Sequence, residues 1–107
     1  MISKILMMAC LLPLAAPALA LDEAGSESLM RKSGCFKCHA IDKKKDGPSY
    51  KELSAKWKGK ADAMDKLSLQ ITSTPKVKID GKEEDHEPLK SKDPADVKSV
   101  VNWILSR

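Results

Sequence analysis

The sequence predicts an all-α fold in which about four short helices make one small domain. Apolar residues recur at helical spacing in separate segments, each bounded by glycine, proline or capping residues. By contrast, apolar residues alternate with lysines only around Val77 and Ile79, a stretch too short to pair as a sheet alone. The chain has 107 residues, which is room for one domain.

Three helices are expected in the first two thirds of the chain, over residues 24–33, 49–56 and 61–72. Gly34 stands where the first helix would end, and Gly47-Pro48 marks a turn after a polar loop over residues 40–47. The apolar positions of the three helices are Leu29 and Met30, then Tyr50, Leu53 and Trp57, then Met64, Leu67 and Ile71.

The last helix is the clearest element, and it follows a stretch over residues 74–92 that has no helical period. Asp93 is a suitable N-cap, Pro94 suits the first helical position, and Asp96 stands where a capping-box acid would. One apolar face with Trp103 beside it is then made by Val97, Val100, Val101, Ile104 and Leu105.

The first 20 residues have the pattern of a secretory signal peptide. Lys4 supplies a positive charge, an apolar run follows, and Ala18-Leu19-Ala20 is a small-x-small cleavage site. A transmembrane anchor would need around 20 apolar residues, whereas prolines interrupt this shorter run. Cys10 lies within the apolar run and is interpreted as an ordinary residue of it. We therefore expect a signal peptide over residues 1–20, a domain over residues 21–107 and a periplasmic protein.

The composition is 42% apolar, 32% charged and 4% aromatic, with a net charge of +4. These values argue against a multidomain enzyme, a membrane span, a disordered chain and a strongly basic nucleic-acid binder. Without residues 1–20 the chain approaches the size, about 70–80 residues, below which a core alone seldom suffices. The domain is therefore expected to hold additional core material.

Cys35, Cys38 and His39 form the motif Cys-x-x-Cys-His, by which c-type haem is covalently attached. Two sulfurs three residues apart on a helical turn can reach two vinyl groups of one porphyrin edge. The imidazole rises on the same side and can bind the iron. A thioredoxin-like disulfide would need a preceding strand, and a zinc site would need two more ligands where only His86 remains. We therefore expect one haem c as the cofactor.

Other segments resemble the small bacterial class I c-type cytochromes over nearly all of residues 24–107. The resemblance rests on Ser33-Gly34 before the haem motif, on Gly47-Pro48-Ser49-Tyr50 and on the terminal helix over residues 100–106. It implies a haem in a crevice of four or five helices, with the first and last helices crossing so that Leu29 meets Trp103.

The same resemblance implies roles for three residues near the haem. The Pro48 carbonyl would accept a hydrogen bond from His39, which would bind the iron, although Pro48 also reads as a plain turn residue. Tyr50 and Trp57 match positions where the family places aromatic side chains against the haem or its propionates. The Trp57 indole N–H would be able to donate to a propionate. Ordinary packing of Tyr50 and Trp57 in the core would explain the presence of these two aromatic residues equally well.

The sequence departs from the family at the sixth iron ligand. Class I cytochromes usually supply Met from the loop before the last helix, but that loop here contains His86 and no Met. Met30 and Met64 lie on expected apolar helix faces. His86 is therefore interpreted as the second axial ligand, or else as a surface histidine in an acidic loop. Ligation would lower the reduction potential, and acidic neighbours would favour its protonated form, so that it dissociates at low pH.

The expected function is that of an exported one-electron carrier and not an enzyme, since no nucleophile–base pair or paired carboxylate site is visible. Residues 37–60 carry a net charge of +5 around the haem motif, which suits either a redox partner with an acidic docking patch or simple solubility. We expect a monomer that binds no nucleic acid. The alternatives are a gas-binding or sensing haem protein with a labile or open distal site, and the cytochrome subunit of a larger periplasmic redox enzyme.

Overall fold

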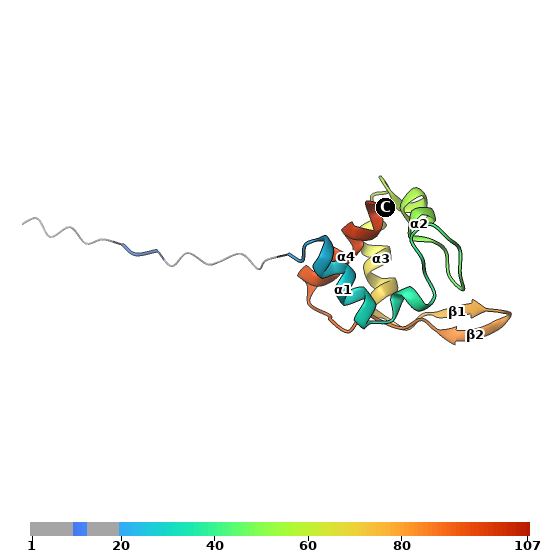
Figure 1. Ribbon diagram of the computed structural model, residues 1–107. Helices are drawn as coiled ribbons and strands as arrows, with labels where there is room; N and C mark the ends of the chain where they lie inside the picture. Colours follow the sequence, from blue (N-terminus) through green and yellow to red (C-terminus); the bar gives the residue numbers. More distant parts are fainter. Residues whose placement is uncertain (1–9, 13–19) are drawn as a thin grey trace, which may run out of the picture.

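The computed structural model describes residues 10–12 and 20–107. The elements in chain order are α1 (Glu23–Lys32), the 3-10 turn η1 (Cys35–Lys37), α2 (Tyr50–Trp57), α3 (Ala63–Thr72), the strands β1 (Lys76–Ile79) and β2 (Lys82–Asp85), and α4 (Pro94–Leu105) (Figure 1). The expected all-α class is therefore confirmed, with helix ends that differ from the prediction by one or two residues. Most of the expected signal peptide, residues 1–20, lies outside the described residues.

Polar side chains fix the beginnings of three helices. Asp22 accepts a hydrogen bond from the amide of Gly25 at the start of α1, at 2.7 Å. Ser49 accepts from the amide of Glu52 at the start of α2, at 3.1 Å. Asp93 accepts from the amide of Ala95 at the start of α4, at 2.9 Å. Each side chain satisfies one of the amides that a helix start leaves without a partner.

Asp96 does not form the direct capping box that the sequence predicts. It accepts a hydrogen bond from the hydroxyl of Ser91 at 2.6 Å, and the amide of Asp93 donates to the same hydroxyl at 3.3 Å. Ser91 thus connects the two groups because a shorter Asp side chain stands where a capping box has Glu or Gln.

The two strands form an antiparallel hairpin that projects from the helical body (Figure 1). Its turn residues Asp80 and Gly81 have φ angles of 50° and 78°, which suit a two-residue hairpin turn. The alternation around Val77 is visible in the sequence, but its partner strand is not. β2 (Lys82–Asp85) is fully exposed and contains no apolar residue, so it carries no periodic signal.

Helix α4 is the centre of the core and contacts α1, α2 and α3. The first and last helices pack together as expected, with Leu29 partly buried against the core cluster that contains Trp103. Arg107 places its guanidinium 4.2 Å from the Trp103 ring centroid and forms an ion pair with Glu23. The core consists of Met30, Tyr50, Leu67, Ile71, Leu89, Val97, Val100, Val101, Trp103 and Ile104.

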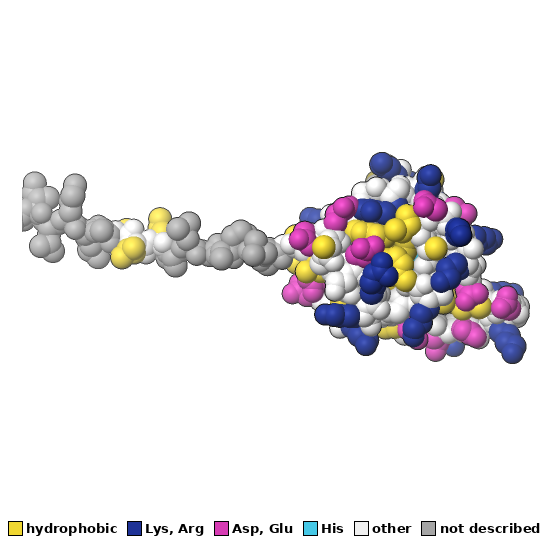
Figure 2. All heavy atoms as spheres, in the orientation of Figure 1, with side chains coloured by type: hydrophobic (Ala, Val, Ile, Leu, Met, Phe, Trp, Pro, Cys, Tyr) yellow, Lys and Arg dark blue, Asp and Glu magenta, His cyan; other side chains and the backbone are white. Residues whose placement is uncertain are grey.

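On the visible face of the helical body, charged side chains of both signs surround an apolar patch (Figure 2). The hairpin also carries Lys and acidic side chains together (Figure 2). Among the described residues no helix combines the length and the apolarity that a membrane crossing needs.

Candidate functional site

The Cys-x-x-Cys-His motif begins on η1, shortly after the end of α1. Gly34 has a φ angle of 79°, a left-handed conformation that ends α1 and redirects the chain into the motif. The His39 amide then donates to the Cys35 carbonyl at 3.1 Å, which closes a turn around the two thiols. Cys35 and Cys38 are both half-buried and form no disulfide. Burial raises the pKa of the Cys35 thiol to about 11.

The His39 imidazole is held by the turn at Gly47 and Pro48. Its Nδ1 lies 2.6 Å from the Pro48 carbonyl oxygen. A carbonyl can only accept, so Nδ1 carries a proton, and in the neutral imidazole Nε2 is then the nitrogen with the free lone pair. A Cβ atom at Gly47 would lie only 2.6 Å from His39 Cε1, so the backbone passes closer to the ring than any other residue type permits.

His86 follows β2 and faces the same region as His39. The centroids of the two imidazole rings are 6.3 Å apart, and the ring planes differ by 54°. Nδ1 of His86 is buried and has no hydrogen-bond partner among the described residues. A buried polar atom without a partner is costly, so a group outside the polypeptide is needed to satisfy it.

The expectation that acidic neighbours favour protonated His86 is wrong. Burial lowers the pKa of His86, and the nearby His39 lowers it further. Glu87 acts in the opposite direction through its backbone and its charge, but these effects are smaller. The three residues of β2 next to His86 in sequence, Glu83, Glu84 and Asp85, are exposed, so that water screens their charges, and Asp85 also forms an ion pair with Lys76.

The two imidazoles have a spacing that suits a metal ion between them. A metal–imidazole nitrogen bond is about 2 Å long, and each nitrogen is roughly 1.1 Å from its ring centroid, so two opposed ligands place their centroids about 6 Å apart. The observed 6.3 Å agrees with this value. Free Nε2 on His39, unsatisfied Nδ1 on His86 and two free half-buried thiols fit a covalently attached haem.

Tyr50 and Trp57 occupy different environments. Tyr50 is 2% exposed, and its ring centroid is 5.2 Å from that of His39, so it packs beside this imidazole. Burial raises the pKa of Tyr50, and Cys35 and Cys38 add to the effect. Trp57 is half-buried against the core. The ammonium groups of Lys56 and Lys60 lie 5.5 and 5.3 Å from its ring centroid, close enough for cation–π attraction.

The two methionines of the domain are part of the helical packing. Met30 is 1% exposed within the core, and Met64 packs against the core from α3. The Ser68 hydroxyl donates to the Met64 sulfur at 3.7 Å. Neither thioether belongs to the loop that carries His86.

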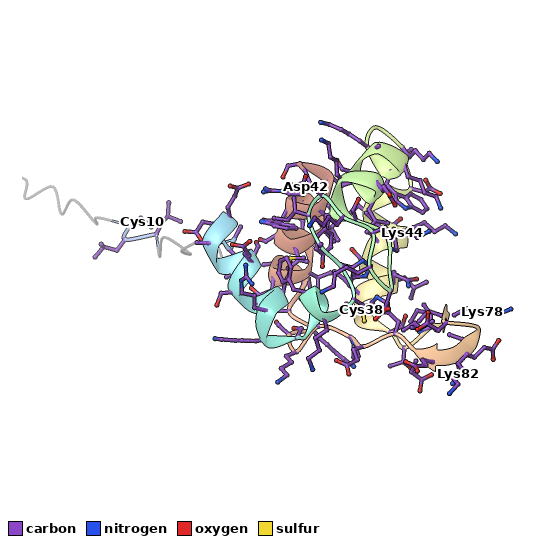
Figure 3. The ribbon with its side chains drawn as sticks, turned by 45° about the vertical axis from the view of Figure 1, so that its right-hand side comes forward. Cys10, Cys38, Asp42, Lys44, Lys78 and Lys82 are labelled. Atoms are coloured by element: carbon purple, nitrogen blue, oxygen red, sulfur yellow. The ribbon has the colours of Figure 1, made fainter. Side chains whose placement is uncertain are left out.

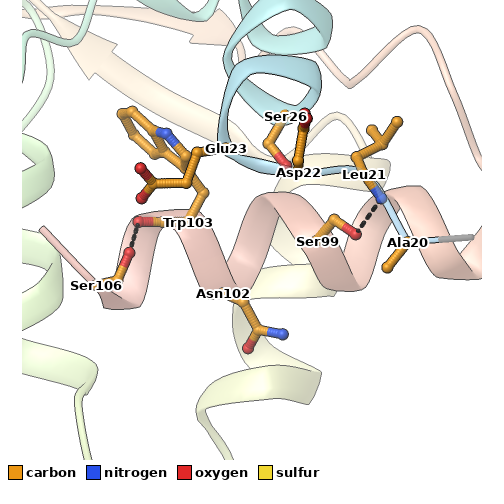
Figure 4. A pocket seen from close by; sticks show the side chains of 9 residues that line it. All are labelled: Ala20, Leu21, Asp22, Glu23, Ser26, Ser99, Asn102, Trp103 and Ser106. Atoms are coloured by element: carbon orange, nitrogen blue, oxygen red, sulfur yellow. Dashed lines mark hydrogen bonds between the residues drawn. The ribbon is translucent and has the colours of Figure 1, made fainter.

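The surface of the described domain includes the following two hollows. One lies where the chain before α1 meets α4, and there the Leu21 amide donates to the Ser99 hydroxyl at 3.1 Å (Figure 4). It contains no residue of the haem motif. The other, of about 340 Å³, includes His39 and the loop after it. In Figure 3 the labelled residues Asp42 and Lys44 mark this loop, and Cys38 precedes them. The labelled lysines of the hairpin, Lys78 and Lys82, lie away from the loop.

Sequence reasoning missed three positions that hold the site. The sequence indicates only a turn at Gly47, whereas the contact of this residue with His39 requires glycine. Pro75 accepts a hydrogen bond from the His86 amide at 2.8 Å. Ser33 is 6% exposed and accepts from the amide of Lys90 at 3.0 Å. The Ser33-Gly34 pair was visible as a family feature, but nothing in the sequence indicates the long-range partners of Ser33 and Pro75.

Comparisons with known proteins point to one family. The family model described as cytochrome c matches residues 23–107. Cytochrome c-551 of Allochromatium vinosum is 35% identical over 80 residues, which span 72% of this chain and 80% of that protein. The match with cytochrome c-551 of Azotobacter vinelandii, 49% identical over 45 residues, spans 42% of this chain and only 55% of the relative.

A solved structure extends the match to the whole domain. The crystal structure of the class 1 cytochrome MtoD from Sideroxydans lithotrophicus ES-1 has a TM-score of 0.75 and 49% sequence identity. The match covers 81% of this chain and 97% of that one. With the family model, the relatives and the attachment motif in agreement, this chain belongs to the cytochrome c family of small monohaem electron carriers, whose members bind one covalently attached haem c through Cys-x-x-Cys-His.

Proposed function

We propose that this chain is an exported one-electron carrier whose haem iron is bound by His39 on one side and by His86 on the other. The observation that carries the proposal is the pairing of the two imidazoles, with ring centroids 6.3 Å apart. The position of Met30 on α1 and Met64 on α3, and not on the loop that carries His86, supports it. When bound, the haem supplies a reversible one-electron couple between ferric and ferrous iron.

The chain contributes attachment, orientation and exclusion of water. Cys35 and Cys38 form the two thioether bonds. The Pro48 carbonyl holds the proton of His39 on Nδ1, and the close approach of Gly47 restricts rotation of the ring. The lowered pKa of His86 keeps its imidazole neutral, which is the form that binds a metal.

An imidazole in place of the usual thioether lowers the reduction potential relative to Met-ligated relatives, because Met ligation is what raises it in cytochromes c. With His39 and His86 both bound, the iron would have no open position for a small gas. This distinguishes the proposed carrier from a gas-binding protein, whose ferrous form would bind carbon monoxide rapidly at neutral pH.

The partner is proposed to be a redox protein with an acidic docking surface. Residues 37–60 hold eight lysines, and all eight are exposed. A positive surface beside the haem attachment site steers acidic partners into weak, salt-sensitive complexes that suit rapid electron exchange. The signal pattern that ends at Ala20 supports export, with the partner in the periplasm.

The test is to replace His86 with Met in the haem-loaded protein and to measure the midpoint potential and the ferric absorption spectrum. We expect a higher potential and the appearance of the charge-transfer band of Met-ligated ferric haem. His86→Ala should give a high-spin ferric spectrum and rapid carbon monoxide binding. Glu87→Met is the matched control, because it places a thioether at the next, exposed residue and should change neither property. A His86→Ala spectrum identical to that of the wild type would refute ligation by His86.

A further inference from the structure

The strand pairing of the hairpin that precedes His86 continues as far as His86 itself. β1 and β2 pair Lys76 with Asp85, Val77 with Glu84, Lys78 with Glu83 and Ile79 with Lys82. The next pair in this register joins Pro75 and His86, and the His86 amide donates to the Pro75 carbonyl at 2.8 Å. His86 is therefore the last rung of the ladder and not a residue of a free loop.

The register also decides to which face the His86 side chain points. Paired residues of an antiparallel ladder share a face, and successive residues alternate between faces. His86 thus shares its face with Val77 and Ile79, which are half-buried, whereas Lys76 and Lys78 on the other face are exposed. A shift of the pairing by one residue would turn His86 to the exposed face.

Both ends of the segment are anchored to the body. On one side, Pro75 lies shortly after the end of α3, where its ring restricts the backbone. On the other side, the Leu89 amide donates to the Ile71 carbonyl at 2.8 Å, and the Leu89 side chain is 3% exposed. Because both ends of the segment are anchored, the position of His86 depends on the register of the hairpin between them.

We propose that the hairpin formed by β1 and β2 is a positioning device that sets the distal ligand, so that its register and turn control whether His86 reaches the iron. The inference rests on the proposed function, since it assumes that His86 is a ligand. It assigns a role to hairpin residues other than His86, which do not themselves bind the iron in the proposed function. The residues concerned are those of the ladder and the turn residues Asp80 and Gly81.

Two glutamates of β2 provide a matched test. Hydrogen-bonded pairs alternate along an antiparallel ladder, and the bond between His86 and Pro75 fixes the phase. The amide of Glu84 therefore belongs to the ladder with Val77, whereas the amide of Glu83 points away from β1. Both side chains are exposed. Glu84→Pro and Glu83→Pro thus remove the same charge, but only the first removes a ladder donor.

The experiment uses the haem-loaded full chain and records ferric absorption spectra, carbon monoxide association and circular dichroism. Glu84→Pro should give a partly high-spin ferric spectrum and several-fold faster carbon monoxide association, and added imidazole should restore the low-spin spectrum. Glu83→Pro should match the wild type. Wild-type spectra and association rates in both variants would overturn the inference.

The turn gives a second pair of variants if Glu84→Pro does not fold or load haem. Gly81 has a φ angle of 78°, which a β-branched residue does not tolerate, whereas glycine at Asp80 accepts its φ angle of 50° freely. Gly81→Val should therefore loosen His86, and Asp80→Gly should not. An unchanged Gly81→Val protein would contradict the proposal. His86→Ala distinguishes the proposed ligation from the proposed role of the hairpin. If His86→Ala stays low-spin, His86 is not a ligand. If His86→Ala becomes high-spin while both hairpin variants stay low-spin, only the proposed role of the hairpin is refuted.

Discussion

The backbone of Gly47 lies against the imidazole of His39 so closely that a Cβ atom there would be 2.6 Å from Cε1 and 2.9 Å from Nδ1. The same ring is bonded through Nδ1 to the carbonyl of the next residue, Pro48. Orientation of His39 is thus set by a contact and a hydrogen bond from two adjacent residues.

Replacing Gly47 with Ala should therefore disturb His39 as well as the fold. The methyl group must displace either the ring or the backbone that carries Pro48, and overpacking of this kind costs about 1–3 kcal/mol. We expect a lower free energy of unfolding and a shifted ferric spectrum, measured by denaturant titration and absorption on the haem-loaded protein.

Gly59→Ala is the control for this variant. Gly59 has a φ angle of 80°, so alanine there is strained by about 1–2 kcal/mol, but its Cβ would meet no atom within 4 Å. It should lose stability and keep the wild-type haem spectrum. If Gly47→Ala also keeps that spectrum, the contact with His39 does not orient the ring.

Ser33 connects the segment before the haem motif to the segment after His86. Its hydroxyl donates to the Leu29 carbonyl at 2.8 Å and accepts from the Lys90 amide at 3.0 Å. Ser33→Ala leaves this amide without a partner, at a cost of about 1–3 kcal/mol. We expect a corresponding fall in the free energy of unfolding, measured by denaturant titration.

The chain offers a close control in Ser73. Ser73 also follows a helix and donates to the carbonyl four residues earlier, Leu69, but within the described part of the chain it accepts no long-range bond. Ser73→Ala should therefore cost less than Ser33→Ala. Equal losses would mean that the bond to Lys90 contributes nothing to stability.

The sequence predicts the helices well because the signals for each helix lie within its own segment of the chain. Asp93 and Pro94 begin α4, and its apolar face is periodic, so propensity and burial agree there. The sequence indicates β1 but not β2, for the opposite reason. β2 consists of Lys, Glu and Asp, all exposed, and it pairs because the Asp80-Gly81 turn brings it back against β1.

The attachment motif can be recognised from the sequence alone because its chemistry requires a fixed local spacing of Cys35, Cys38 and His39. The environment of His86 cannot be recognised in this way, since its pKa follows from burial and from His39, which is distant in sequence. Neighbours in sequence suggested acidic surroundings, whereas neighbours in space determine the direction of the shift. Contacts between remote segments, such as Ser33 with Lys90, leave no local pattern to read.

The positive charge after the haem motif should govern reactions with anionic electron acceptors. Lys43 and Lys44 are exposed on the loop that follows His39, and neither makes an ion pair among the described residues, whereas Lys45 is bonded to the Phe36 carbonyl at 2.9 Å. Lys43→Glu/Lys44→Glu should slow oxidation of the reduced protein by ferricyanide several-fold at low ionic strength, because charge beside the reacting edge sets the local anion concentration.

Lys66→Glu/Lys98→Glu makes the same change of charge at exposed positions of α3 and α4, so net charge alone would slow both double variants equally. Stopped-flow rates should instead fall more for Lys43 and Lys44, which flank the attachment site. The difference should shrink as salt rises, because exposed charges more than about 10 Å apart are largely screened at 0.1 M. Equal slowing, or slowing that persists in high salt, would mean that the loop lysines do not mark the face through which electrons leave.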